Sequence, residues 1–489
     1  MKADLYLGVD IGTSVAKGVV IDDSGTPLTR ASFVRQDSSQ DLVKKEHNAE
    51  QVWWNEFLLV TNQLLGELKT SKENIKSVAV TAMVPNLLPI DARGRPLQNA
   101  ILYYDGRATL IEEALDAETG TPYYLNHVLS QLIWLKTEMG SQWRLVDKIL
   151  TTHNYIVFKL TDKICVDTIT AGEFGNLLDS HKMEWNQELL ERHGLNDSVF
   201  PRIITPTNIV GFVSERAAKN TGLPAGVPVL AGTTDMIGSF IGSGAWNRND
   251  IMIYYGTYGC APMLLDNLRE AIFKERLNYP IEWRASIPRS GQQLSALAQV
   301  LFSSDSPQVA LSKLDTMAAA SSPGANGVVF VQILDLPRST ESTEPQGALF
   351  NLGRTSTMVD ICRAILEAFG YGLRYRFETS SFGTAPKKCF AAGGGARSKI
   401  WRQIVSDIIG LEQSYSPYSS SAFGSAVLAA VAVDPEVWER VRELQTRTIE
   451  TDPPHSENEG RYGPAYQQYK NYLERFTRTL SLAVADHTQ

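Results

Sequence analysis

The sequence predicts an α/β fold of two related domains, because a strand that ends in a glycine turn with hydroxyls occurs in both halves of the chain. The first example is LYLGVDIGTSVAKGVVID (residues 5–22), which reads as a strand, a tight turn at Gly12 and a second, β-branched strand. The second is IMIYYGTYG (251–259), which follows the apolar strand and glycine turn of VPVLAGTTD (227–235). At 489 residues the chain also exceeds what one core usually supports, so two domains are expected.

Each half would bring one phosphate-binding hairpin to a shared nucleotide cleft. This arrangement is that of the actin-like (ribonuclease H-like) ATPases, in which two α/β domains clamp a nucleotide. We place the domains at residues 1–244 and 245–489, and we expect the small-residue stretch GSFIGSGAWNRN (238–249) to form the crossing between them.

The composition indicates a folded protein and argues against several classes of partner. Hydrophobic residues make up 43% and charged residues 20% of the chain, which is normal for a globular protein. The net charge of −8 gives no basic footprint for nucleic acid, and no apolar run approaches the roughly 20 residues that span a bilayer. The four cysteines are far apart without CxxC spacing, so neither a disulfide framework nor a zinc site is indicated. We therefore expect a soluble cytoplasmic protein that binds neither nucleic acid nor a membrane.

The first glycine turn carries residue types that bind a phosphate and a metal ion. Gly12 frees backbone N–H groups, and Thr13 and Ser14 add hydroxyls that can close on a phosphate. Asp10 is placed to hold a metal-bound water, and Lys17 adds a compact positive charge. Two ordinary interpretations compete with this one: a hairpin whose Asp and Gly merely make the turn, and a Lys17 that is only a solvated surface residue.

A third glycine-rich turn lies near the C-terminus. CFAAGGGARS (389–398) ends a strand in three glycines, and the helix KIWRQIVSDIIG (399–410) follows, with Ile404 and Ile408 on its apolar face. Consecutive glycines let a planar ring or a phosphate approach the backbone, although they also make plain strand-to-helix turns. The chain has no GxxxxGK[ST] P-loop and no GxGxxG in a leading βαβ unit, so neither of those nucleotide folds is supported.

Taken in order, these motifs resemble the FGGY carbohydrate kinases, and most closely the xylulokinase and gluconokinase branch. The order is DIGTSVAK, YYDGR, GTTD, GTYG, RAILEAFGYGLR and GGGARSKIWRQIVSDIIG, within a resemblance that covers residues 5–432. One such motif has modest specificity, but six in the family order are strong evidence together. The resemblance implies ATP as substrate and Mg²⁺ as cofactor, with a sugar-binding side in residues 1–244 and a nucleotide-binding side in 245–489. It also allows a homodimer, since many relatives are dimers.

The resemblance implies roles for individual residues. Asp235 matches the general base that takes the proton from the attacking sugar hydroxyl, and Asp10 matches the acid that holds magnesium directly or through water. An Asx turn or a helix cap is the alternative interpretation of Asp235. The positions that match nucleotide-binding residues are Gly12, Thr13, Ser14 and Lys17 in the first phosphate loop, Gly256 and Thr257 in the second, and Gly394, Gly395 and Ser398 in the adenosine loop.

On the sugar side, Tyr103 matches an aromatic residue that stacks on sugar C–H groups. Asp105 matches a carboxylate that accepts hydrogen bonds from vicinal hydroxyls, although its Asp-Gly pair also suits a surface turn. Two departures from the xylulokinase pattern fall in the expected sugar pocket: Val84-Pro85 replaces Met-His, and Met236 follows the base where Asn is usual. Each removes a polar group from that pocket, which leaves the identity of the sugar open.

We therefore interpret the chain as an ATP-dependent kinase of a small sugar or sugar derivative, with D-xylulose or another pentulose favoured. A gluconate or polyol kinase of the same family is the alternative. Two other classes stay open, namely a catalytically weak sugar-sensing protein that keeps the fold and an actin-like ATPase or filament protein. Neither the phosphorylated hydroxyl nor the oligomeric state follows from the sequence.

Overall fold

The chain divides into two compact units. The computed structural model describes residues 3–35, 45–120, 123–275, 279–332, 334, 347–380 and 384–487. The first unit contains Met1–Trp246, Asp266–Pro280 and Ser420–Arg447, and the second contains Asn247–Leu265, Ile281–Ser419 and Thr448–Gln489. The contacts thus assign two later segments of the chain to the first unit, in addition to its N-terminal half.

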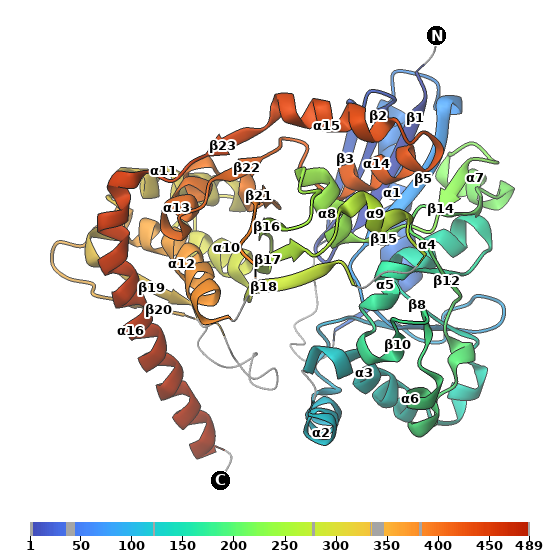
Figure 1. Cartoon of the computed structure of the whole chain (residues 1–489), viewed down its shortest axis with the longest axis horizontal. Helices are drawn as coiled ribbons and strands as arrows, with labels where there is room; N and C mark the ends of the chain where they lie inside the picture. Colours follow the sequence, from blue (N-terminus) through green and yellow to red (C-terminus); the bar gives the residue numbers. More distant parts are fainter. Residues whose placement is uncertain are drawn as a thin grey trace. The chain divides into compact units, whose positions relative to one another are not determined.

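The first unit is built on a seven-stranded mixed sheet (Figure 1). Its strands are β1 (Leu5–Ile11), β2 (Val15–Asp22), β3 (Pro27–Val34), β5 (Ile75–Ala82), β13 (Ile209–Phe212), β14 (Pro228–Leu230) and β15 (Thr233–Thr234). The order is β13-β14-β5-β1-β2-β3, and β15 also pairs with β5. β1 and β2 form the predicted antiparallel hairpin, whereas β5 and β15 run parallel to β1.

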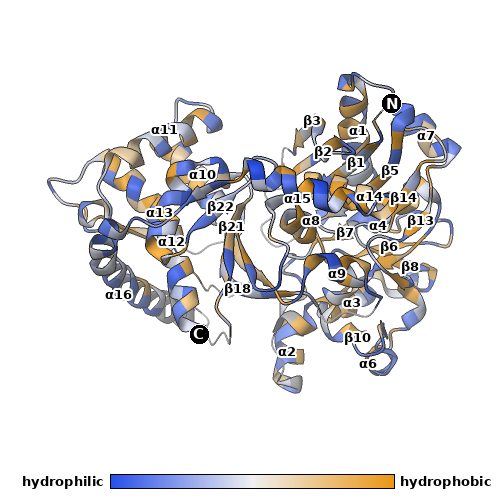
Figure 2. Cartoon of the chain, turned by 45° about the horizontal axis from the view of Figure 1, so that its top comes forward, coloured by the Kyte–Doolittle hydropathy of each residue, from blue (hydrophilic) through white to orange (hydrophobic). Residues whose placement is uncertain are grey.

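Helices cover both faces of this sheet, which is why every residue of β1 is buried. α14 (Ser421–Val433) lies on one face, where a Cβ atom added to Gly8 would stand 2.1 Å from the α14 backbone. α1 (Asn55–Glu67) lies on the other face, where a Cβ atom added to Gly18 would stand 2.5 Å from an α1 side chain. Figure 2 shows the apolar colouring of α14 beside these strands. The two glycines therefore allow close packing on both faces.

α14 also crosses α8 (Asp235–Ser243) at very short range. A Cβ atom added to Gly424 would stand 1.9 Å from the carbonyl oxygen of Gly238, so only glycine fits at the crossing. This contact joins residues almost 200 positions apart and holds the first turn of α8 against the sheet.

The other helices of the first unit surround this core. They are α2 (Thr109–Thr119), α3 (Tyr123–Met139), α4 (Thr152–Thr161), α5 (Thr168–Gly172), α6 (Gln187–Arg192), α7 (Glu215–Thr221), α9 (Leu268–Phe273) and α15 (Val437–Thr448). Two-stranded sheets made by β4 (Glu46–His47), β6 (Leu88–Ile90), β7 (Ala100–Ile101), β8 (Lys148–Leu150), β9 (Val166–Asp167), β10 (Leu178–Asp179), β11 (Glu184–Trp185) and β12 (Ile203–Ile204) join them.

The second unit repeats the strand arrangement of the first on its own six-stranded sheet. The strands are β16 (Asp250–Tyr255), β17 (Gly259–Leu264), β18 (Ile281–Ile287), β21 (Lys388–Ala392), β22 (Gln413–Tyr415) and β23 (Glu450–Asp452). The order is β18-β17-β16-β21-β22-β23. Three strands form an antiparallel meander, and β21 runs parallel to β16 as β5 runs parallel to β1. This repetition confirms the prediction of two related α/β domains.

The core of the second unit includes two helices, one of which is the helix that the sequence predicts after the three glycines. α13 (Lys399–Ile409) buries Ile404 and Ile408, and α12 (Met358–Thr379) buries most of its first four turns. The remaining elements are α10 (Ser290–Leu301), α11 (Pro307–Ala320), α16 (Ser456–His487), β19 (Val329–Gln332) and β20 (Gly347–Phe350).

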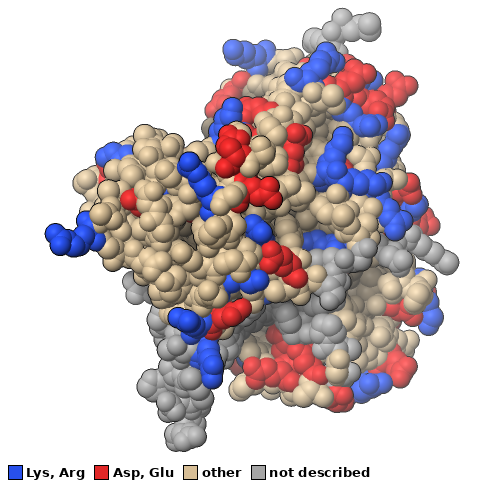
Figure 3. All heavy atoms as spheres, turned by 60° about the vertical axis from the view of Figure 1, so that its left-hand side comes forward, with Lys and Arg blue, Asp and Glu red and all other residues tan. Residues whose placement is uncertain are grey.

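The described residues show no membrane-crossing feature among their helices: none is long and apolar enough to span a bilayer. Figure 3 shows that acidic and basic side chains both occur across the face drawn.

Candidate active site

The carboxyl ends of three parallel strands bring the sequence-predicted residues of the first unit together. In the sheet register Asp10 pairs with Thr81, and Thr81 pairs with Thr233 on the next strand. The Met83 N–H then donates to the Ile11 carbonyl at 3.1 Å, directly beyond the paired residues. Because parallel strands end at the same edge, the Gly12 turn, Val84-Pro85 and Asp235-Met236 all begin at this edge.

Asp10 is buried and held by hydroxyls. Its side chain accepts hydrogen bonds from Thr81 Oγ1 at 3.0 Å and from the Ser421 hydroxyl of α14. Burial raises the pKa of Asp10, and the positive charge of Lys17, its partner across the β1–β2 hairpin, opposes that rise. The sequence interpretation of Lys17 as a charge near the phosphate loop is compatible with this location.

Asp235 opens α8 and is partly exposed. The preceding Thr234 caps the helix, because its Oγ1 accepts from the Ile237 N–H at 3.2 Å. Burial by the surrounding atoms, together with the charge of Asp10, raises the pKa of Asp235 to about 7. The Asp235 carboxyl is therefore reachable from solvent, and its pKa suits proton transfer near neutral pH.

The two carboxyls fit Mg²⁺ better than they fit a transition metal. Among the described residues, no group of three or more His, Cys, Asp and Glu side chains could hold a metal ion. Mg²⁺ needs no such cage, since it usually keeps several waters and binds through one or two carboxylates plus substrate phosphates. Asp10, with Asp235 as its charged neighbour, meets that requirement.

The first glycine turn differs in one detail from the sequence interpretation. The Gly12 N–H is not free, because it donates to the Val15 carbonyl at 3.2 Å and closes the turn. Within the part of the chain that the structure describes, the Thr13 and Ser14 N–H groups have no hydrogen-bond acceptor. These two amides, with the Thr13 and Ser14 hydroxyls, are the groups that could bind a phosphate.

The predicted sugar-side residues lie beside this turn. Val84 and Pro85 are partly exposed, and the buried Asn86 side chain donates to the Met83 carbonyl at 2.9 Å. The Asn86 side chain also accepts from the Tyr103 N–H at 3.0 Å. The Tyr103 hydroxyl lies 3.4 Å from Thr13 Oγ1, so the predicted aromatic residue contacts the phosphate loop.

Asp105 lies close by, but its carboxylate is committed to the protein. It is 3% exposed and accepts from the Lys45 N–H at 2.7 Å, the Arg107 N–H at 3.0 Å and Arg107 Nε at 2.9 Å. Arg107 Nη2 also donates to it at 2.8 Å, and the guanidinium stacks 4.3 Å above the Trp134 ring. With both oxygens occupied, this geometry favours a positioning role over the direct sugar contact that the sequence suggests.

Glu173 is a candidate that the sequence interpretation missed. It follows α5, is partly exposed and accepts a hydrogen bond from the Tyr279 hydroxyl. Burial, together with the charges of Asp235 and Asp167, raises the pKa of Glu173 to about 7. The buried Asp167 caps α5 and accepts from Thr233 Oγ1 at 2.9 Å, which links α5 to the strand before Asp235. Nothing in sequence spacing connects Glu173 with Asp235, because the link runs through this packing.

The second unit carries the other predicted nucleotide loops. Gly256 and Thr257 form the turn between β16 and β17, and the Thr257 carbonyl accepts from the Gly291 and Gln292 N–H groups at 3.2 and 3.3 Å. These two amides belong to the first turn of α10.

The predicted adenosine loop of the second unit ends in a helix cap. Ser398 Oγ accepts from the Trp401 N–H at 3.2 Å and begins α13. A side-chain atom at Gly394 would meet nothing within 4 Å, whereas one at Gly395 would stand 2.4 Å from the Trp401 ring. Gly394 therefore has open space beside its backbone, whereas Gly395 is packed against Trp401.

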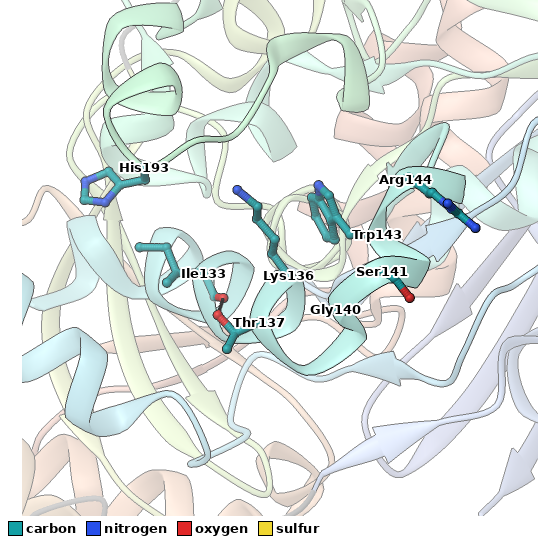
Figure 4. Close-up of a pocket in the computed structure, with 8 residues that line it drawn as sticks. All are labelled: Ile133, Lys136, Thr137, Gly140, Ser141, Trp143, Arg144 and His193. Atoms are coloured by element: carbon teal, nitrogen blue, oxygen red, sulfur yellow. Dashed lines mark hydrogen bonds between the residues drawn. The ribbon is translucent and has the colours of Figure 1, made fainter.

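A separate hollow of about 570 Å³ lies on α3 and the segment that follows it (Figure 4). It is lined by Ile133, Lys136, Thr137, Gly140, Ser141, Trp143, Arg144 and His193. Figure 4 shows Lys136 between His193 and Trp143, with Arg144 turned away. Its lining includes none of the sequence-predicted site residues.

Two family models match most of the chain. The N-terminal domain model of the FGGY family of carbohydrate kinases matches residues 5–242, and the C-terminal domain model of the same family matches residues 282–433.

Similar proteins and similar solved structures are carbohydrate kinases as well. The xylulose kinase of Escherichia coli is 26% identical over 451 residues, which is 88% of this chain and 91% of that protein. The solved xylulose kinase of Rhodospirillum rubrum is 24% identical with a TM-score of 0.78 and covers 97% of this chain and 99% of its own. The gluconate kinase of Lactobacillus acidophilus is 19% identical with a TM-score of 0.78 and covers 97% and 98%. At these identities the solved structures establish a shared fold.

Proposed function

The chain belongs to the FGGY family of carbohydrate kinases, and we propose that it transfers the γ-phosphoryl group of ATP to a hydroxyl of a pentulose. The observation that carries this proposal is the partly exposed Asp235 carboxyl at the strand ends, whose pKa is raised to about 7 and which interacts electrostatically with Asp10. Such a carboxyl is about half ionised at neutral pH, so it can accept a proton during the reaction and release it afterwards.

Asp235 would act as the general base. As the acceptor hydroxyl attacks the γ-phosphorus, its proton passes to the Asp235 carboxylate, and the bond between the γ-phosphorus and the bridging oxygen of ADP breaks. A hydroxyl that keeps its proton is a weak nucleophile, so loss of this carboxylate should affect turnover far more than ATP binding.

Asp10 and three loops would hold the nucleotide. The Thr13 and Ser14 amides would bind phosphate oxygens, with Lys17 as a nearby positive charge. Asp10 would hold Mg²⁺ directly or through water, and the bound ion would neutralise charge on the phosphates. Among the remaining predicted residues, Gly256 and Thr257 would contact the phosphates, and Gly394, Gly395 and Ser398 the adenosine.

The acceptor would contact both apolar and aromatic side chains. Val84, Pro85 and Met236 would form the apolar side, and Tyr103 would stack on sugar C–H groups. We infer an indirect role for Asp105. Its hydrogen bonds to Arg107 would hold the segment that carries Tyr103 in place.

The acids around the base favour a neutral acceptor. Asp10 and Glu173 both interact electrostatically with Asp235, so the carboxylate of an aldonate such as gluconate would enter among like charges. A pentulose has no such charge. D-xylulose or another pentulose is therefore the preferred substrate, and gluconate or a polyol is the second candidate.

ATP turnover against a panel of acceptors tests this proposal. The panel contains xylulose, ribulose, gluconate, erythritol and glycerol, with Asp235→Ala as the blank. We expect ADP release that depends on a pentulose and is absent in the blank. Turnover with gluconate alone would overturn the substrate assignment. ATP binding without sugar-dependent ADP release would contradict the kinase assignment and favour a sugar-sensing protein.

A further inference from the structure

Arg35 contacts the first phosphate loop from the end of β3. Its side chain is 11% exposed and forms a two-pronged ion pair with the buried Glu56 of α1, Nε to Oε1 at 2.7 Å and Nη2 to Oε2 at 2.6 Å. From there Nη2 donates to the Gly12 carbonyl at 3.3 Å, and Nη1 donates to the Thr13 carbonyl. The Arg35 backbone N–H donates to the Ser14 carbonyl at 2.9 Å. One residue therefore binds three consecutive carbonyls of the loop.

These contacts fix the direction of the amides that could bind phosphate. In a trans peptide the C=O and the following N–H point in opposite directions. The Gly12 carbonyl shares its peptide plane with the Thr13 N–H, and the Thr13 carbonyl shares its plane with the Ser14 N–H. When Arg35 holds both carbonyls, both N–H groups must point away from Arg35. They are the two amides of the turn that find no acceptor within the described residues.

The protein itself takes four of the guanidinium N–H groups of Arg35. An arginine carries five N–H donors. Glu56 takes two, and the two loop carbonyls take two more. Nη1 also lies 3.5 Å from the ring nitrogen Nε2 of His47. Arg35 therefore acts on a phosphate through the loop, and a lysine, which lacks the planar fork, could not replace these contacts.

We propose that Arg35 is a positioning residue that aims the Thr13 and Ser14 amides at the phosphate chain of ATP, and that Glu56 holds the guanidinium in place. The proposal deepens the proposed function, because it rests on ATP being bound at this loop. It adds a residue from outside the sequence motifs to the nucleotide site.

Binding of a non-hydrolysable ATP analogue with Mg²⁺, measured by calorimetry without acceptor, tests the proposal. Removing Arg35 alone would leave the Glu56 carboxylate buried and unpaired, so the main variant is Arg35→Gln with Glu56→Gln. We expect its dissociation constant to rise by roughly 10- to 100-fold, because two charge-assisted hydrogen bonds that orient the loop are lost. Arg35→Lys should weaken binding as well, and the KM for the sugar should stay within about twofold.

Two controls separate positioning from a general loss of stability. Arg95→Gln removes an exposed arginine that pairs with Asp91, away from the first loop, and should not change the dissociation constant. Leu64→Ala weakens the α1 core and should lower the unfolding temperature without changing the dissociation constant. Wild-type affinity in the folded double variant would overturn the proposal, and so would an equal loss of affinity in Leu64→Ala.

Hydrogen–deuterium exchange at single residues tests the proposal on the unmodified protein, even where a variant fails to fold. The ATP analogue should slow exchange of the Thr13 and Ser14 amides and leave the Gly12 amide unchanged, because Gly12 already donates to Val15. Unchanged exchange at both residues in the bound protein would overturn the proposal. Binding of the analogue without sugar-dependent turnover would contradict only the proposed function.

Discussion

The two glycine hairpins occupy equivalent positions in their sheets, but different groups hold their loops. In the first unit the carbonyls of residues 12–14 accept from Arg35, which directly follows the strand β3. In the second unit the Thr257 carbonyl accepts from two backbone amides in the first turn of α10. The same local motif can thus be fixed by a side chain or by a helix terminus. A side chain can be removed by mutation, whereas the helix amides can only be displaced.

The largest effect should come from displacing the helix in the second unit. A Cβ atom at Gly291 would stand 2.2 Å from the Gly256 carbonyl oxygen, so Gly291→Ala must move one backbone segment or the other. Because misplacement by about 1 Å can reduce an enzymatic rate about 100-fold, we expect a loss of that size in kcat/KM for ATP.

Gly66→Ala is the matched control for this change. Gly66 lies in α1, where an added Cβ would meet nothing within 4 Å, and alanine is the better helix former. Steady-state kinetics of both variants check the prediction. Wild-type kinetics in Gly291→Ala would show that the contact with α10 does not position the second loop.

The next largest effect should be a pH dependence of activity. We assign it to the first unit because Asp235 and Glu173 both belong to that unit. Their pKa values are both raised to about 7. A base that must be ionised loses about tenfold in activity between pH 8 and pH 6, so kcat/KM for the sugar should fall by that factor. Asp235→Glu should shift the midpoint of this profile, and a flat profile in the wild type would contradict the assigned base.

The same pKa values determine how stability changes with pH. Both carboxyls bind their proton more tightly in the folded chain than in the unfolded chain, where ordinary values apply. Their contribution to the free energy of unfolding is therefore complete below about pH 4 and is lost as the pH rises through about 7. Chemical denaturation of the wild type and Asp235→Asn at pH 5 and pH 8 should show a smaller decline in the variant. An identical decline would mean that Asp235 has an ordinary pKa.

The smallest effects should come from the loop hydroxyls. If backbone amides are the main phosphate ligands, the Ser14 hydroxyl of the first loop and the Thr257 hydroxyl of the second are auxiliary donors. Ser14→Ala and Thr257→Ala then each remove one such donor. We expect the KM for ATP to rise by about threefold or less, as for one neutral hydrogen bond. A loss as large as that of the Arg35→Gln/Glu56→Gln protein would show that the hydroxyls, rather than the oriented amides, are the main ligands.

The sequence predicts well what is encoded locally. Strand alternation and glycine turns predict both hairpins, and the spacing of Ile404 and Ile408 predicts the buried face of α13. Residues whose role depends on distant partners are not predicted in this way. Arg35 follows a strand like many exposed arginines, and only the packing of α1 brings Glu56 to it.

Two further cases show the same limit. Asp105 looks like a free carboxylate in the sequence, but Arg107 and the Lys45 amide occupy its oxygens once the chain is folded. α14 lies about 400 residues after β1 in the sequence. Its Ser421 nevertheless contacts Asp10, and its Gly424 packs directly against the backbone of α8. Such contacts depend on tertiary packing, which local propensity does not encode.

Turnover by Asp235→Asn with its ATP affinity measured in parallel tests the central claim most directly. The substitution keeps the size of the side chain and removes its ability to accept a proton. We expect kcat with the preferred sugar to fall by about 100-fold or more, in the range typical of a lost general base, while the dissociation constant for the ATP analogue stays within about twofold. Near-normal turnover in Asp235→Asn would contradict the account, because the proton of the attacking hydroxyl would then have to leave by another route.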